Sequence, residues 1–156
     1  MDQENRFPVR KNPRLKCYDY TSCNYYFVTI CTCGKQPLFG EPEHLSTFGR
    51  IAEECLAEVP THFAQAHIDK WVVMPNHVHA IVVLSGGVDL STVVGQYKGA
   101  VTRRIHSVQP ELTVWQTSFH DHVIRDQRDY ERIWAYIDTN PIRWEKDCFY
   151  LPKDTK

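Results

Sequence analysis

Two apolar runs that flank a short turn constrain the fold of this chain more than any other feature of its sequence. Residues 72–84, VVMPNHVHAIVVL, carry β-branched residues on both sides of the turn at 74–76, which predicts a strand, a tight turn and a second strand. Side chains alternate between the two faces of a strand, so His77 and His79 are expected on one face and Val78 on the other. Both imidazoles should therefore point into the same space.

The paired histidines need polar partners at that position, because an unsatisfied buried polar group costs about 1–3 kcal/mol. A bound metal ion would serve both rings, and imidazole is a good ligand for one. Two separately hydrogen-bonded histidines are the alternative explanation of the same pattern. A third ligand elsewhere in the chain is needed to favour the metal site.

Length and composition predict one domain. The chain has 156 residues, of which 42% are hydrophobic and 12% aromatic, enough for one ordinary core. We expect this domain at residues 21–147, preceded by a basic arm at 1–20 and followed by a tail at 148–156. No apolar run approaches the roughly 20 residues that cross a bilayer, and the polar start does not resemble a signal peptide. These features favour a cytoplasmic protein.

The six cysteines are expected to be reduced thiols, because the chain shows no export signal and disulfides are rare in the cytosol. They are Cys17, Cys23, Cys31, Cys33, Cys55 and Cys148. Cys31 and Cys33 lie inside a strand-like run, and no second closely spaced pair follows them. A zinc ribbon is therefore not expected.

Periodicity and turn residues predict seven main elements in the order β-α-β-β-α-β-α. Strands are expected at residues 25–32, 66–74, 77–84 and, with some irregularity, 112–124. Helices are expected at about 46–59, 89–106 and 127–139, and a loop at 35–43. The first six elements match the split βαβ motif, so we predict an α+β fold of the ferredoxin-like class, with an antiparallel sheet and helices on one face. The last helix would then pack on this sheet.

The last helix carries candidates for the rest of the site. Tyr136 and Asn140 are four residues apart, so their side chains share one edge of the helix, and Arg132 lies one turn earlier at that edge. Taken alone, Asn140 is an ordinary C-terminal helix residue and Tyr136 a boundary aromatic. Together with the two histidines, Asn140 would complete a neutral ligand set, which leaves the charge of a divalent cation available to an anionic ligand.

A phosphodiester is an anionic ligand of this kind. A metal ion that binds its non-bridging oxygen draws charge from phosphorus and stabilises the transition state. The Tyr136 phenol can attack that phosphorus and form a covalent phosphotyrosine, and its usual pKa near about 10 means that the metal field and Arg132 would have to help. The ester energy is retained, so a strand end can attack the phosphotyrosine later without ATP. This chemistry cuts and rejoins DNA.

Five longer phrases carry a resemblance that covers residues 14–147, nearly the whole chain. They are YYFVTICT, VVMPNHVHAIV, GQYKGAVTRRI, VWQTSFHDHVIR and YIDTNPIRW. In combination they resemble the REP-associated tyrosine transposases, which belong to the single-tyrosine HUH transposase superfamily. Ala80 and Tyr97 depart from the expected pattern, which has glycine and phenylalanine there, but neither residue touches the proposed chemistry.

The resemblance implies a role for each of four residues. His77 and His79 would be the metal ligands of the HUH motif, Asn140 the third ligand, and Tyr136 the catalytic nucleophile. It also implies Mg²⁺ or Mn²⁺ as the cofactor, single-stranded DNA with a hairpin as the substrate, a 5′-phosphotyrosine intermediate and a free 3′-OH. Relatives with this chemistry can act as dimers that share a site, so both a monomer and a homodimer remain open, as does a tyrosine that acts in its own or in the partner subunit.

Basic and aromatic side chains are the candidates for contact with DNA. The net charge is −1, which excludes a basic surface over the whole molecule, but local patches matter more for phosphate binding than the total. Aromatic rings can stack on unpaired bases. The candidates are Arg14, Lys16, Lys98, Arg103, Arg104, Trp115, His122, Arg125 and Arg132. For any single one of them, a solvated face or a place in the core is the alternative.

Two rival sites are weaker. Tyr97 could be a nucleophile, but it lies on the apolar stripe of its helix and is expected in the core. His120 and His122 are again two residues apart and could form a second metal pair. Without a nearby third ligand, we expect them to form hydrogen bonds or to contact DNA.

Three function classes remain open. The first is a metal-dependent DNA transposase that uses Tyr136. The second is a domesticated protein that binds repeat hairpins and no longer transposes, although the intact set of site residues disfavours lost chemistry. The third is a metal-dependent phosphodiester hydrolase in which the histidines activate water, but the sequence shows no carboxylate ligands near them.

Overall fold

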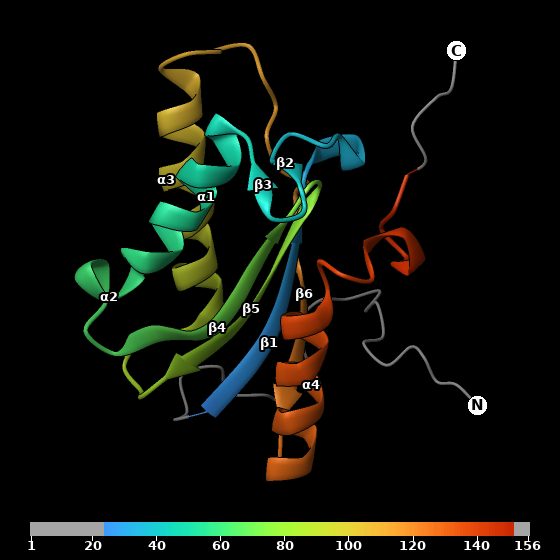
Figure 1. The fold of residues 1–156 in the computed structure, drawn as a ribbon. Helices are drawn as coiled ribbons and strands as arrows, with labels where there is room; N and C mark the ends of the chain where they lie inside the picture. Colours follow the sequence, from blue (N-terminus) through green and yellow to red (C-terminus); the bar gives the residue numbers. More distant parts are fainter. Residues whose placement is uncertain (1–23, 152–156) are drawn as a thin grey trace.

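A four-stranded antiparallel sheet forms the centre of the computed structural model, which describes residues 24–151 (Figure 1). Its strands are, in spatial order, β4 (Ala66–Met74), β5 (His77–Leu84), β1 (Asn24–Cys31) and β6 (His120–Ile124). All three neighbouring pairs are antiparallel. Together with the helices between the strands, this order confirms the predicted α+β fold of the ferredoxin-like class.

The helices lie on both faces of the sheet (Figure 1). Helices α1 (Thr47–Ala57) and α3 (Leu90–His106) cover one face, where they enclose the larger core with Tyr26, Val28 and Val82. Helix α4 (Gln127–Thr139) packs on the other face, where Ile133 and Ile137 meet apolar side chains of β1, β5 and β6. The prediction of helices on one face therefore holds for the two helices of the βαββαβ unit, while α4 covers the face to which the histidines belong.

Among residues 24–151, none of the helices has both the length and the apolar character that a membrane span requires.

Side-chain caps fix where the helices begin. The Ser46 hydroxyl accepts a hydrogen bond from the Gly49 amide at 3.1 Å, and the Asp89 carboxylate accepts one from the Thr92 amide at 2.8 Å. Each cap satisfies a backbone N–H that has no partner within its helix. The predicted starts of the first two helices are thus confirmed.

Five short elements have no counterpart in the sequence prediction. They are the strands β2 (Gly40–Glu41) and β3 (His44–Leu45), the short helix α2 (Val59–His62), and the 3₁₀ helices η1 (Cys33–Lys35) and η2 (Trp144–Lys146), of which η2 follows α4. The strands β2 and β3 pair with each other at the end of the predicted loop.

The fourth strand is shorter than predicted. Only His120–Ile124 pairs with β1, whereas Trp115 forms an isolated bridge with Thr32. The Lys98 ammonium donates to the Gln116 carbonyl at 2.7 Å, so a side chain satisfies a backbone group that a strand would pair. The aromatic Trp115, which suggested a long strand, instead packs against a distant segment, with its ring 5.5 Å from that of Phe39.

Three of the described cysteines agree with the prediction of reduced thiols. Cys31, Cys33 and Cys55 are free thiols. Burial raises the pKa of Cys31 to about 12, so this thiol is unreactive at neutral pH. Cys17 and Cys23 lie outside the described residues, as do the DNA-contact candidates Arg14 and Lys16.

Candidate active site

The two histidines lie side by side on the face of the sheet that α4 covers. Both are buried, with exposed fractions of 0% for His77 and 1% for His79, and their ring centroids are 4.4 Å apart. His77 Nδ1 lies 2.9 Å from the Asn76 amide oxygen, and His79 Nδ1 lies 2.9 Å from the hydroxyl of Thr29 on β1. These neighbours can accept from Nδ1, which leaves each Nε2 with a free lone pair.

Both rings are neutral at physiological pH. Burial lowers the pKa of His77 to about 3, and the nearby Asn140 side chain opposes this shift only in part. Burial and the neighbouring His77 hold the pKa of His79 well below its usual range, against the opposing charge of Asp147. Neutral imidazole is the form that binds metal ions, so the environment keeps the pair ready for coordination.

Asn140 lies beside the histidines at the C-terminal end of α4, and its side chain is held in place. It is buried, with 3% exposed, and its Nδ2 donates to Asp147 Oδ2 at 2.8 Å. Asp147 follows η2, and its other oxygen accepts from the Phe149 amide at 2.8 Å. Because Nδ2 of Asn140 faces Asp147, the amide oxygen Oδ1 faces away from it.

Among the described residues, three buried atoms at this site have no hydrogen-bond partner, namely Nε2 of His77, Nε2 of His79 and Oδ1 of Asn140. Unsatisfied buried polar atoms are rare and costly, and they mark places where an ion or ligand binds. The ligand atoms of His77, His79 and Asp147 all lie within 4.8 Å of one another. The residues therefore fit a divalent metal ion.

Asp147 overturns the expectation that no carboxylate lies near the histidines. The chain returns to the site after α4, and this long-range return has no signature in the local spacing of residues. Phe149, in the predicted tail, also packs here, with its ring 4.4 Å from that of His77 and its carbonyl accepting from Asn76 Nδ2 at 2.7 Å. The only sequence signal for this cover is the aromatic character of the segment after residue 141.

Tyr136 lies next to the histidine pair. Its ring centroid is 5.3 Å from that of His79 and 6.2 Å from that of Phe27 on β1. The rival nucleophile Tyr97 is buried on the opposite face of the sheet, where its hydroxyl donates to the Ala52 carbonyl at 3.0 Å. Tyr136, on α4, therefore lies beside the histidines, whereas Tyr97, on α3, lies in the core as predicted.

The family is shown by comparison with known proteins. Residues 19–140 match the family model described as "Transposase IS200 like". The chain belongs to this IS200-like transposase family. Membership shows that the protein has a transposase role and is a DNA-processing enzyme. It agrees with the resemblance found in the sequence.

Individual relatives and a solved structure are also similar to this chain. An uncharacterised protein of Haemophilus influenzae is 32% identical over 91% of this chain and 93% of its own length. The REP-associated tyrosine transposase of Escherichia coli is 34% identical over 56% of this chain and 53% of its own length. A solved structure of a REP-associated tyrosine transposase bound to a REP hairpin matches with a TM-score of 0.67 and 24% identity, over 84% of this chain and 74% of that one. At this identity, the last similarity shows the fold.

Several DNA-contact candidates of this transposase are engaged within the fold on the face away from the histidines. Lys98 binds backbone carbonyls, and the Trp115 indole donates to the Lys98 carbonyl at 3.1 Å. Arg104 forms ion pairs with Glu58 at 2.6 Å and with Glu54 at 3.4 Å. Arg103 is exposed on α3. A DNA contact at these positions stays a prediction.

His122 and Arg132 meet on the α4 face of the sheet. His122 Nε2 lies 2.7 Å from Asp129 Oδ2, and Arg132 donates to Asp129 Oδ1 at 2.6 Å. The described residues hold no second cluster of three metal-ligating side chains around His120 and His122. The hydrogen bond of His122 agrees with the hydrogen-bonding role expected for this residue.

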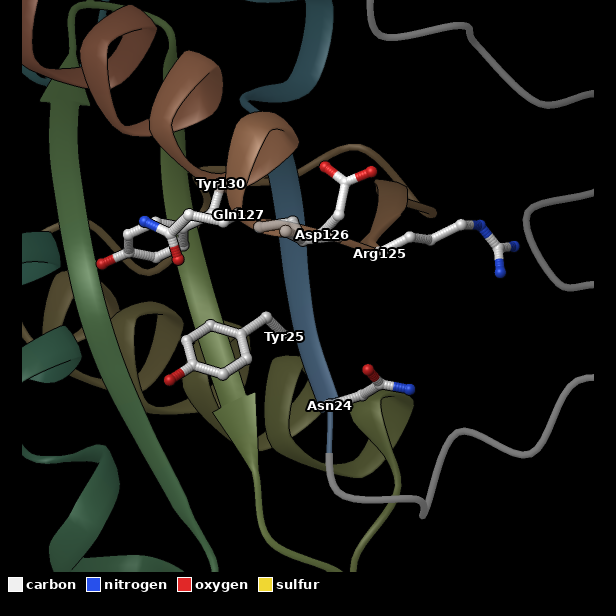
Figure 2. Close-up of a pocket in the computed structure, with 7 residues that line it drawn as sticks. Asn24, Tyr25, Arg125, Asp126, Gln127 and Tyr130 are labelled. Carbon is white, nitrogen blue, oxygen red and sulfur yellow. The ribbon is translucent and has the colours of Figure 1, made fainter.

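Arg125 lines a cavity of about 290 Å³ at the other end of the sheet. Figure 2 shows this cavity between the start of β1, with Asn24 and Tyr25, and the start of α4, with Asp126, Gln127 and Tyr130. Asn24 pairs with Leu84, whereas Cys31 at the far end of β1 pairs with His77. The cavity is thus separated from the histidines by most of the length of a strand.

Proposed function

We propose that this transposase cleaves and rejoins single-stranded DNA at hairpin-bearing repeats, through a 5′-phosphotyrosine on Tyr136. The observation that carries the proposal is the set of three unpartnered, buried ligand atoms of His77, His79 and Asn140 beside the ring of this tyrosine. A REP hairpin is bound by the protein whose structure matches this fold, which supports a hairpin substrate here.

His77, His79 and Asn140 would hold a divalent ion, Mg²⁺ or Mn²⁺, with the Asp147 carboxylate close enough to join them. When bound, the ion supplies Lewis-acid catalysis at the phosphate. Asn76 and Thr29 hold the Nδ1 side of the two rings, which leaves each Nε2 available to the ion that these residues would hold. Asp147 holds the Nδ2 side of the Asn140 amide, which leaves Oδ1 available to the ion.

Tyr136 supplies the nucleophile. Its phenol oxygen bonds to phosphorus and loses its proton, while the bond from phosphorus to the 3′ oxygen breaks and that oxygen gains a proton. The products are a DNA end linked to Tyr136 through its 5′ phosphate and a free 3′-OH. Attack by a 3′-OH reverses the step and rejoins DNA without ATP, because the number of phosphoester bonds is unchanged.

The proposed site is complete within one chain. Helix α4, which carries Tyr136 and Asn140, packs on the strands that carry the histidines of the same chain. We therefore propose that the tyrosine acts in its own subunit, so that a monomer suffices for cleavage.

The proposal is tested by incubating the protein with Mn²⁺ and a labelled single-stranded hairpin oligonucleotide, followed by a denaturing gel. We expect a covalent protein–DNA band that a metal chelator prevents, and mass spectrometry should locate the nucleotide on Tyr136. Hairpin binding without any covalent band would instead indicate the domesticated binding protein. Cleavage without a covalent band would indicate the hydrolase, for which Asp147 would supply a carboxylate ligand.

Asp147→Ala is expected to weaken Mn²⁺ binding by about tenfold or more, because it removes both a carboxylate at the ion and the contact that orients Asn140. Isothermal titration calorimetry of the DNA-free protein measures this Kd. Glu145→Ala, on the exposed side of η2, is the matched control and should bind Mn²⁺ like the wild type. An unchanged Kd for Asp147→Ala would remove this residue from the metal site.

A further inference from the structure

Strand β4 carries one extra residue opposite β5, and that residue is Asp69. Ile68 pairs with Val82 and Lys70 pairs with Ile81, so Asp69 has no opposite residue on β5. Such a β-bulge bends the strand and re-aims its side chains, and bulges are common next to active sites. Here the bulge lets two consecutive residues, Asp69 and Lys70, both reach α4.

The two residues contact α4 at different heights. The Tyr130 hydroxyl donates to the Asp69 carboxylate. The Lys70 ammonium donates to Asp138 Oδ1 at 2.8 Å and lies 3.9 Å from the centre of the Trp134 ring. The three α4 residues follow one another at intervals of four, so they form one stripe along the helix. The bond to Asp69 raises the pKa of Tyr130 to about 12, which keeps this phenol protonated as a donor.

Apolar packing alone leaves the position of α4 poorly defined. Its fully buried side chains are Ile133 and Ile137, with 0% exposed each. Burial of apolar surface is not directional, so this stripe of two isoleucines fixes which side of α4 faces the sheet but only loosely fixes its height along the sheet and small rotations about its axis. A slide along the sheet, or a rotation too small to expose Ile133 and Ile137, would still move Tyr136 away from His79.

We infer that Asp69 and Lys70 form a polar latch that sets the rotation and height of α4, and thereby positions Tyr136 beside the histidines. The inference rests on the proposed function, in which Tyr136 attacks the phosphate. Both are positioning residues, since they act through α4. The Lys70–Asp138 ion pair is only partly buried, and such pairs add little to folding stability, so breaking the latch is expected to shift the helix without unfolding the domain.

The test combines Asp69→Ala with Lys70→Met and measures the rate of covalent adduct formation at saturating Mn²⁺ and saturating hairpin oligonucleotide. We expect a loss of about tenfold for each single variant and about a hundredfold for the pair, because small displacements of a reacting group have effects of this size. The Kd for the hairpin and the melting temperature should stay near the wild-type values. Lys70→Arg, which keeps the charge, should retain most of the rate.

Amide hydrogen exchange provides a readout that does not depend on activity. In the double variant, peptides of α4 should exchange faster, while peptides of α3 should be unchanged. Glu58→Gln is the matched control, because it breaks the 2.6 Å ion pair with Arg104 on the other face of the sheet. This control should alter neither the adduct rate nor the exchange of α4.

The outcomes separate the latch from the proposed function. A double variant that forms the adduct at the wild-type rate overturns the latch, and the proposed function stands. If the wild type forms no adduct on Tyr136, the proposed function fails, and the latch is judged on hydrogen exchange alone. In that case unchanged exchange of α4 overturns the latch, and faster exchange confined to α4 supports it.

Discussion

Tyr136→Phe is expected to abolish the covalent protein–DNA band, with a loss of about a thousandfold or more in adduct formation. The substitution removes a single oxygen, the proposed nucleophile, and keeps the ring that packs edge-on against Phe27 and His79. The fold, Mn²⁺ binding and hairpin binding should therefore be retained. Denaturing gels of time courses with a labelled hairpin oligonucleotide measure the effect.

Tyr97→Phe is the matched control for this experiment. It also removes one phenol oxygen, but on the face of the sheet away from the histidines, where the hydroxyl donates to the Ala52 carbonyl. We expect a normal covalent band and a loss of about 1 kcal/mol in the free energy of unfolding. If the band persists in Tyr136→Phe and disappears in Tyr97→Phe, the nucleophile is Tyr97 and the assignment to Tyr136 is wrong.

His77→Ala is expected to abolish cleavage while leaving most of the DNA affinity. The substitution removes one of the two imidazoles that hold the ion, so the affinity for Mn²⁺ should fall by about a hundredfold or more. Hairpin binding depends mainly on phosphate contacts of basic residues, so its Kd should change by no more than about threefold. Calorimetry with Mn²⁺ and filter binding with the hairpin oligonucleotide separate the two effects.

His67→Ala provides the comparison, because His67 is an exposed histidine on the neighbouring strand β4. It should cleave and bind as the wild type does. Binding by both variants should also weaken steeply as salt is added, as expected for phosphate contacts. An equal loss of cleavage and hairpin binding in His77→Ala, with the fold intact, would contradict a role confined to the metal site.

Much of the fold could be predicted because it depends on local periodicity. The alternation in HVHAIVVL placed both histidines on one face, and the polar caps Ser46 and Asp89 marked the helix starts. The stripe of α4 predicted that this helix packs on the sheet, and it packs on the face that holds the histidines. These features need only the geometry of one element at a time.

The parts that could not be predicted depend on contacts between distant segments. The segment 112–119 has strand-like composition, but its structure is irregular. It is held by the hydrogen bond from Lys98 to the Gln116 carbonyl and by the packing of the Trp115 ring on Phe39. Asp147 and Phe149 reach the histidines only because the chain folds back after α4. The bulge at Asp69 likewise depends on the pairing of β4 with β5.

The site uses the second face of the sheet in a way that follows from this architecture. The face under α1 and α3 is filled by the larger core and supplies stability. The face under α4 has a small apolar cluster beside buried polar atoms, so its geometry depends on specific contacts more than on packing. Successive residues of the same strands therefore contribute in turn to the proposed active site on one face and to the core on the other.

The most direct test is a crystal of the full chain soaked with Mn²⁺ and examined at a wavelength where manganese scatters anomalously. We predict one strong peak within coordination distance of Nε2 of His77 and Nε2 of His79, facing Asn140 Oδ1 and lying on the side of the sheet that carries Tyr136. A peak bound elsewhere, with both Nε2 atoms hydrogen-bonded to protein groups instead, would contradict the metal site.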